Sequence, residues 1–149
     1  MSVNEDLVVR SPETPFEWQQ YYELRWQVLR CPWNQPEGSE KDEREDECWH
    51  RAVFCGSRIA GVARIQMNSI FEAQIRYMAV DSEFRGRGIG RLLVESLEGV
   101  AREQGAEKIV LDARSEAVGF YLVLGYQVVG DSYLLFDTIQ HYRMEKVLF

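Results

Sequence analysis

An apolar segment that leads through a glycine- and arginine-rich turn into a long amphipathic helix constrains the fold of this chain more than any other feature. The turn covers residues 85–90 and reads RGRGIG. After it, apolar side chains recur at helical spacing from Ile89 to Ala101, which predicts a helix over residues 88–104 with one buried stripe. Gly105 then stands where a left-handed residue commonly ends a helix. We therefore place a strand–turn–helix unit at the centre of the fold.

Hydrophobic periodicity and turn residues predict the remaining elements. Helices are expected at residues 16–30, which end before Pro32, and from Glu116 until Gly125 stops the helix. Strands are expected at residues 7–10, 50–55, 58–67, 71–80, 108–112, 126–134 and 140–148. This order predicts an α/β (α+β) fold in which a mixed central sheet of six to seven strands carries flanking helices. A single domain over residues 1–149 is expected.

Charge is distributed unevenly along the sequence. The chain has a formal net charge of −7, which argues against nucleic-acid binding because that function needs a basic face. Residues 37–47 hold seven acids and two bases, in a stretch expected to be a loop or a loop with a short polar helix from Ser39. Residues 85–91 hold three arginines and no acid, so this acidic chain concentrates positive charge beside its glycines.

Other sequence features bear on location and on metal content. The acidic N-terminus lacks the apolar core of a secretory signal, and no apolar run approaches the ~18 residues of a membrane span. The three cysteines, Cys31, Cys48 and Cys55, lack CxxC spacing and are expected to be reduced thiols in the cytoplasm. His50 and His141 lie far apart in the sequence, so no metal site is expected.

The turn at residues 85–91 has the chemistry of a phosphate site. The N-terminus of the following helix offers unpaired backbone N–H groups and a partial positive charge. Glycines remove the Cβ atoms that would keep a phosphate away from the backbone, and arginines add charge-assisted hydrogen bonds. The alternative is a flexible turn whose arginines are only solvated. A dinucleotide fingerprint does not fit, because Arg91 stands where its third glycine belongs, and no Gly-Lys-Ser/Thr closes the turn as in a P-loop.

Two segments in order resemble the GNAT superfamily of N-acetyltransferases. Residues 85–90 match the R/Q-x-x-G-x-G/A signature of that family and follow an apolar strand, as is usual there. Residues 120–126, FYLVLGY, resemble its second motif, and together the two motifs span residues 71–130. Residues 22–30 and 139–144 are more loosely similar to the ElaA-like branch, whose substrates are poorly defined.

The resemblance implies acetyl-CoA as co-substrate and assigns roles by motif position. The backbone of Met78 and Val80, at a bulge in their strand, would pair with the pantetheine arm and the thioester. The turn at residues 85–91 would hold the pyrophosphate. Tyr121 would lie near the thioester sulfur and protonate the leaving thiolate as general acid, with a merely packed helix aromatic as the alternative. The implied cofactor-binding residues are Met78, Ala79, Val80, Arg85, Gly86, Arg87, Gly88, Ile89, Gly90 and Arg91.

The general base is less defined than the general acid. Several relatives place a carboxylate on the strand ahead of the bulge, where this sequence has Gln74. Glu72 shares that side of an ideal strand and is a candidate base, with an exposed strand-end acid as the alternative. His141 is a second candidate, although its alternation with polar neighbours favours a solvated strand face. A chain of water molecules without a dedicated base is the third alternative.

The resemblance implies direct transfer of an acetyl group to a primary amine of a small molecule or peptide. A non-catalytic acyl-CoA-binding regulatory module and a partner-binding domain with an empty turn remain alternatives, because a fold does not fix a function. No nucleic-acid or membrane partner is expected, and homodimer formation is left open. The acidic stretch at residues 37–47 is expected to face the acceptor entrance and favour cationic amines, with a solvated loop as the alternative.

Overall fold

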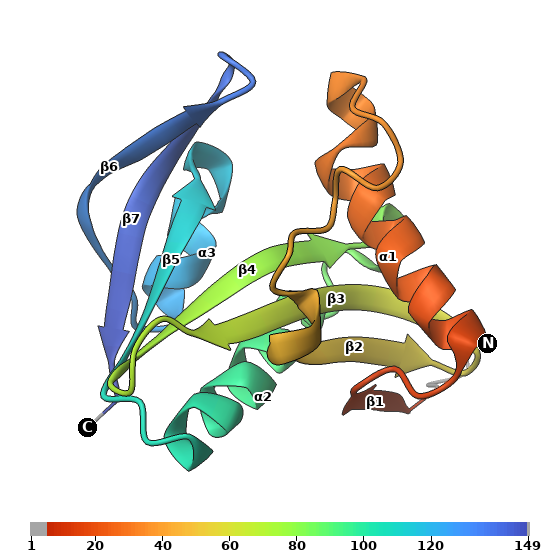
Figure 1. The fold of residues 1–149 in the computed structure, drawn as a ribbon, viewed down its shortest axis with the longest axis horizontal. Helices are drawn as coiled ribbons and strands as arrows, with labels where there is room; N and C mark the ends of the chain where they lie inside the picture. Colours follow the sequence, from red (N-terminus) through yellow and green to blue (C-terminus); the bar gives the residue numbers. More distant parts are fainter. Residues whose placement is uncertain (1–5, 149) are drawn as a thin grey trace.

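The computed structural model describes residues 6–148, which form one seven-stranded sheet with helices on its faces (Figure 1). The strands lie in the order β1-β2-β3-β4-β5-β7-β6. Their bounds are β1 Leu7–Arg10, β2 Trp49–Cys55, β3 Arg58–Met67, β4 Glu72–Val80, β5 Lys108–Arg114, β6 Gln127–Leu135 and β7 Ile139–Val147. The helices are α1 Pro15–Leu29, α2 Ile89–Glu103 and α3 Val118–Val123, with 3-10 turns η1 Cys31–Trp33, η2 Glu45–Glu47, η3 Ser82–Phe84 and η4 Ser115–Ala117.

The predicted mixed sheet of six to seven strands with flanking helices is confirmed. Every neighbouring pair of strands is antiparallel except β4 and β5, which run parallel. The predicted short polar helix at Ser39 is wrong, because residues 37–40 form turns and a single 3-10 turn follows at Glu45–Glu47. Residues 1–5, part of the N-terminal segment expected to lack a secretory signal, lie outside the described residues.

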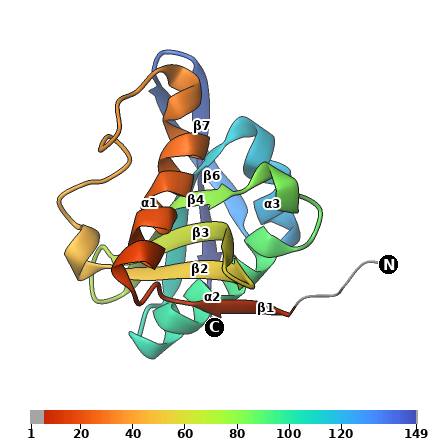
Figure 2. The same cartoon turned by 90° about the vertical axis from the view of Figure 1, so that its right-hand side faces the viewer.

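Two hydrophobic clusters cover the two faces of the sheet. On one face, α2 buries its apolar stripe, including Leu93 and Leu97, against the strands. On the other face, α1 packs Tyr21 and Leu24 against β2 and β3. Figure 2 shows α1 crossing the sheet on the side opposite to α2. The fold is thus a helix–sheet–helix sandwich. The strand–turn–helix unit predicted from the sequence supplies β4 to the sheet and α2 to the layer on one face of it.

The parallel strands β4 and β5 pair at one end only. Their paired residues are 72–74 and 108–110, and Figure 1 shows the two strands diverging beyond them. A bulge in β4 accompanies the separation, because its register with β3 shifts between Val62 and Arg64, and Tyr77 adopts a left-handed φ of 57°. A bulge bends a strand and leaves backbone groups outside the ladder. The divergence therefore opens a space between two strands in the middle of the sheet.

Candidate active site

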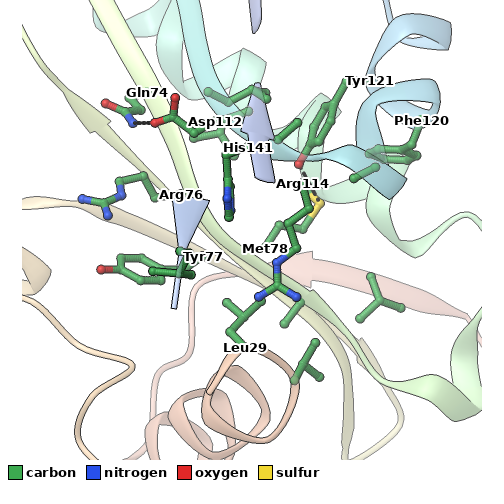
Figure 3. Close-up of a pocket in the computed structure, with 18 of the residues that line it drawn as sticks. Leu29, Gln74, Arg76, Tyr77, Met78, Asp112, Arg114, Phe120, Tyr121 and His141 are labelled. Carbon is green, nitrogen blue, oxygen red and sulfur yellow. Dashed lines mark hydrogen bonds between the residues drawn. The ribbon is translucent and has the colours of Figure 1, made fainter. Parts of the chain in front are cut away.

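A cavity of about 440 Å³ occupies the space between the diverging strands (Figure 3). Its walls come from residues 74–80 of β4 and 111–114 of β5, from the end of α1, from α3, and from β6 and β7. This volume lies in the usual range for small-molecule sites. Because segments far apart in the sequence converge on it, the cavity is the leading candidate for a functional site.

The glycine–arginine turn leads from the bulged strand into α2 at one end of this cavity. Gly86 and Gly88 have φ angles of 78° and 76°, which residues with a Cβ rarely adopt. A Cβ at either position would have no atom within 4 Å, so the space beside the turn is open. No side chain caps α2, whose first backbone bond runs from the Leu92 N–H to the Gly88 carbonyl. The turn thus presents free N–H groups to the solvent beside Arg85, which lines the cavity.

The remaining residues of the turn have contacts of their own. The guanidinium of Arg87 lies 5.2 Å from the centre of the Phe84 ring, and Arg91 pairs with Glu95 at 2.8 Å. Gly90 serves packing between helices, because a Cβ there would lie 2.9 Å from Cζ of Phe120. Of the three arginines, Arg85 is the one that lines the cavity.

Tyr121 reaches the cavity from α3 and meets the bulge. Its hydroxyl donates a hydrogen bond to the sulfur of Met78 at 3.6 Å, which Figure 3 shows as a dashed line. Burial raises the pKa of Tyr121, so the phenol retains its proton throughout the neutral range. A thioether is a weak acceptor. The phenol therefore keeps a donor available for a stronger sulfur acceptor in the cavity.

His141 lies in the cavity wall, not on the solvated strand face that the sequence pattern favoured. It is 4% exposed and stacks on Tyr133 with ring centres 4.4 Å apart. Since a backbone carbonyl only accepts, the contact of Nδ1 with the Ile139 carbonyl at 3.0 Å places the ring proton on Nδ1. Burial lowers the pKa of His141, which keeps the ring neutral. Nε2 is then left with a lone pair.

Gln74 and Asp112 face one another across the parallel strands. The Gln74 amide donates to the Asp112 carboxylate at 3.4 Å, while Ser132 donates to it at 2.7 Å and Arg143 at 3.2 Å. A carboxylate thus lies beside Gln74, but it comes from β5. Alternation along β5 places Asp112 and Arg114 on one face of the strand. That spacing is the signal in the sequence that could have identified both as cavity residues.

Glu72 does not line the cavity. Its carboxylate lies at the start of β4, where Asn68 donates to it at 2.9 Å and Lys108 pairs with it at 3.6 Å. The implied binding residues Met78, Ala79 and Val80 do line the cavity. The structure thus brings the bulge, Arg85 and Tyr121 together and leaves Glu72 apart.

Two carboxylates of the acidic stretch at residues 37–47, those of Asp42 and Glu45, pair with buried arginines, whereas Glu37, Glu43, Asp46 and Glu47 are exposed. Glu45 pairs with Arg25 at 2.9 Å and with Arg64 at 2.7 Å, and both guanidiniums are fully buried. Asp42 also pairs with Arg64 at 2.7 Å. None of residues 37–47 lines the cavity. For Glu45 the expectation that this stretch faces the acceptor is wrong, because Glu45 neutralises two buried arginines. Glu43 and Asp46 are exposed and lie outside the cavity lining.

Two further structural observations concern membranes and metals. Among residues 6–148, no helix combines the length and the apolar character needed to cross a membrane. The same part of the chain holds no group of three or more His, Cys, Asp or Glu side chains arranged to bind a metal ion.

Comparison with known proteins agrees with this architecture. The acetyltransferase (GNAT) family model matches residues 18–126. The uncharacterized N-acetyltransferase YjcF of Bacillus subtilis is 31% identical over 123 residues, which cover 83% of this chain and 87% of that protein. An aminoglycoside 6'-N-acetyltransferase in complex with coenzyme A has a similar fold, with a TM-score of 0.80, 18% identity and coverage of 95% of this chain and 97% of that one. Escherichia coli ElaA is also similar, with a TM-score of 0.74, 16% identity and coverage of 95% and 99%.

The match of the family model covers most of the sequence, and both motifs that carried the resemblance lie within it. The fold of solved members extends over nearly the whole chain. The chain therefore belongs to the GNAT family of acetyltransferases.

Proposed function

We propose that this protein transfers an acetyl group from acetyl-CoA to a primary amine. The observation that carries the proposal is a single cavity in which a strand bulge, a buried phenol and a neutral imidazole meet beside an uncapped helix N-terminus. The bulge and the helix N-terminus correspond to the first of three requirements of the reaction, the phenol to the second and the imidazole to the third. The reaction requires a held thioester, a proton for the leaving thiolate and an acceptor for the proton of the amine.

The turn at residues 85–91 has the properties expected of a pyrophosphate site. The turn combines an α2 N-terminus without a side-chain cap, backbone without Cβ atoms at Gly86 and Gly88, and Arg85, which lines the cavity. Together these groups favour negative charge through the helix dipole and through charge-assisted hydrogen bonds. Acetyl-CoA supplies an activated thioester when it is bound there.

The bulge provides the polar contacts for the reacting end. Residues 77 and 78 together oppose one residue of β3, which leaves the local backbone N–H groups outside the regular ladder. A backbone N–H at Met78 would polarise the thioester carbonyl, as donors in an oxyanion hole do. Tyr121 then donates its proton to the departing sulfur in place of the weak bond to Met78.

We infer that His141 accepts the proton of the amine through Nε2. The ring is held in the required tautomer by the Ile139 carbonyl, and burial keeps it neutral. The amine nitrogen attacks the thioester carbon, the new C–N bond forms as the C–S bond breaks, and the amine proton passes to Nε2. Tyr121 supplies the proton that the leaving sulfur takes up. Asp112 is less suited to the base role, because Ser132 and Arg143 already occupy its oxygens.

Replacement of Gly88 tests the proposal. Gly88→Glu adds bulk and negative charge where a phosphate would approach, at a φ of 76° that is also unfavourable for glutamate. We expect coenzyme A binding to be lost in calorimetric titration of a variant whose circular dichroism shows a folded protein. Gly99→Glu is the matched control, since a Cβ at that α2 position also meets nothing within 4 Å. Unchanged affinity in folded Gly88→Glu protein contradicts the proposed site.

Transfer itself needs a separate measurement. Release of coenzyme A thiol, followed with a panel of amines, should exceed the rate without amine. Tight binding of acetyl-CoA without acetylation of any amine would instead favour the non-catalytic acyl-CoA-binding module.

A further inference from the structure

One end of the cavity contains an uncompensated pair of arginines. Four arginines line the cavity, Arg30, Arg76, Arg85 and Arg114, whereas Asp112 is the one carboxylate among the described lining residues. Arg85 belongs to the end with the proposed pyrophosphate site. Arg76 has a partner in Asp42 at 3.5 Å. Arg30 and Arg114 are left, at the end formed by α1 and β5.

Arg114 has no anionic partner within residues 6–148. Its guanidinium lies 4.6 Å from the centre of the Trp33 ring, and Figure 3 shows the side chain running from β5 toward Leu29 of α1. The neighbouring Glu116 is exposed and does not come within ion-pair distance. Burial and the Arg30 charge lower the pKa of Arg114, whereas the Glu116 charge raises it. A half-buried guanidinium stacked on an indole is thus left with its donors unused.

Arg30 adds a second positive charge at the same end. Its guanidinium donates to the carbonyls of Ser39 and Leu29 at 3.1 and 3.0 Å and lies 5.6 Å from the centre of the Phe136 ring. These partners are neutral, so they fix the orientation of the side chain without cancelling its charge. Two guanidiniums that are close together and partly withdrawn from water are stabilised by an anion between them.

We propose that the acceptor is an amine that also carries a carboxylate, which Arg114 and Arg30 recognise. This proposal rests on the proposed acetyl transfer and names the substrate class of the same cavity. The planar fork of an arginine matches a carboxylate in two parallel hydrogen bonds. Trp33, Tyr133 and Leu135 add apolar surface beside the arginines, which suits an acceptor with an apolar body.

The same charges disfavour purely cationic acceptors. A polyamine would place a second ammonium near two arginines without a carboxylate to balance them. Two acids of the segment that could have attracted such a substrate, Asp42 and Glu45, are engaged with buried arginines, and no residue of the segment lines the cavity. The charge of the cavity is therefore opposite in sign to the charge of the whole chain, which is −7.

Matched pairs of amines test the selectivity of the wild-type protein. L-phenylalanine is compared with phenethylamine, which lacks the carboxylate, and with L-phenylalanine amide, which lacks only its charge. 5-Aminopentanoate is compared with pentylamine and cadaverine in the same way, and O-phosphoethanolamine shows whether a phosphate is accepted too. We expect kcat/KM for the carboxylate member of a pair to exceed that of its partners by about tenfold or more. Equal or greater kcat/KM for the neutral or dicationic members in both series overturns the proposal.

Arg114→Gln removes the charge and should reduce the preference within a pair to nearly one, mainly through KM. Arg114→Lys keeps the charge but loses the fork, so it should retain part of the preference. Arg102→Gln is the control, because it makes the same change on an exposed part of α2 away from the cavity. If folded Arg114→Gln protein keeps the preference for carboxylates, Arg114 does not recognise the carboxylate and the proposal is overturned.

Binding separates this inference from the proposed reaction. N-acetyl-L-phenylalanine and N-acetylphenethylamine are titrated calorimetrically into protein saturated with coenzyme A. Tighter binding of the carboxylate, weakened in Arg114→Gln protein, supports the anion site even if no amine is turned over. If amines are acetylated but the two N-acetyl compounds bind with equal affinity, the proposed acetyltransferase activity stands and the carboxylate site is overturned.

Discussion

At the scale of single residues, replacement of Tyr121, the proposed general acid, can separate loss of a proton donor from loss of co-substrate binding. Tyr121→Phe keeps the ring and its contacts with Phe120 and Tyr126 but removes the proton donor. Because general acid catalysis contributes ~10²–10⁴-fold, we expect kcat to fall by about that factor while coenzyme A affinity stays nearly unchanged. Steady-state kinetics and calorimetry measure the two quantities.

Glu72→Gln is the companion variant for Tyr121→Phe. Glu72 lies outside the cavity and pairs with Lys108, so its replacement should cost much less activity. If Tyr121→Phe protein keeps the wild-type kcat, Tyr121 contributes only packing and is not the general acid. If a folded Glu72→Gln variant is inactive, Glu72 is the general base.

The proposed role of His141 as general base predicts how kcat/KM depends on pH. Burial lowers the pKa of His141 from 6.5, so the neutral ring predominates at pH 6.5 and protonation of the ring limits the reaction mainly below that value. Between pH 6.5 and 9, kcat/KM should therefore follow the ionisation of the amine alone. His141→Gln should lower kcat/KM about 10²-fold across this range. If His141→Gln lowers kcat/KM less than twofold, water deprotonates the amine without a dedicated base. If Asp112→Asn lowers kcat/KM more than His141→Gln does, Asp112 is the base.

At the scale of elements, the segment between α1 and β2 is held by buried charges. Glu45 lies between two fully buried arginines, Arg25 from α1 and Arg64 from β3. The same arginines flank the ring of Tyr77, with distances of 4.6 and 4.8 Å to its centre. Tyr77 is the left-handed residue of the β4 bulge. The acidic segment is thus linked through two arginines to the backbone that shapes the cavity.

Removing the charge of Glu45 should destabilise this arrangement strongly. Glu45→Gln leaves two buried guanidiniums without their shared carboxylate, and breaking a buried pair costs roughly 3–5 kcal/mol of unfolding free energy. Glu47→Gln is the control, since Glu47 is 60% exposed and pairs with Arg44 at the surface, where such pairs contribute about 0–1 kcal/mol. Urea titration at pH 7 compares the two variants. Equal losses would mean that the buried network does not hold the segment.

At the scale of the whole molecule, buried groups predict that acid lowers stability. Burial lowers the pKa of both His50 and His141 from 6.5, so the unfolded chain binds more protons than the folded chain just below that pH. Stability should therefore begin to fall as the pH drops below 6.5. Hydrogen bonding from Arg64 lowers the pKa of Asp42 from 3.8, which extends the loss below pH 3.8.

Urea midpoints at pH 7.5, 6.5, 6, 5 and 4 measure this dependence. We expect little change between pH 7.5 and 6.5 and a steady decline from pH 6.5 to 4. His50→Gln should flatten the decline between pH 6.5 and 5, because it removes one of the two titrating rings. A midpoint that is constant from pH 7.5 to 5 contradicts neutral buried histidines.

The sequence by itself determined the order of elements and the identity of the motif region. Helical spacing of apolar residues predicted α2 to within a residue at each end, because one-sided burial imposes a 3.6-residue period on any sequence. The position of the turn before α2 was also predicted from the sequence, because Gly86 and Gly88 have positive φ angles and glycine adopts that conformation most readily. These properties depend on neighbours in the chain, which a single sequence displays.

Only the tertiary structure decided which side chains meet in the cavity and what the acidic segment does. Arg30, Asp112, Arg114 and His141 come from three separate parts of the chain. The spacing of Asp112 and Arg114 places both on one face of β5, but no local pattern shows that Arg30 and His141 meet them there. The sequence did not distinguish Asp42 and Glu45 from the exposed acids around them, because the arginines that pair with them lie in α1 and β3. Charge compensation acts through space at a few ångströms, so the partner of a buried charge, or the lack of one, is fixed by folding.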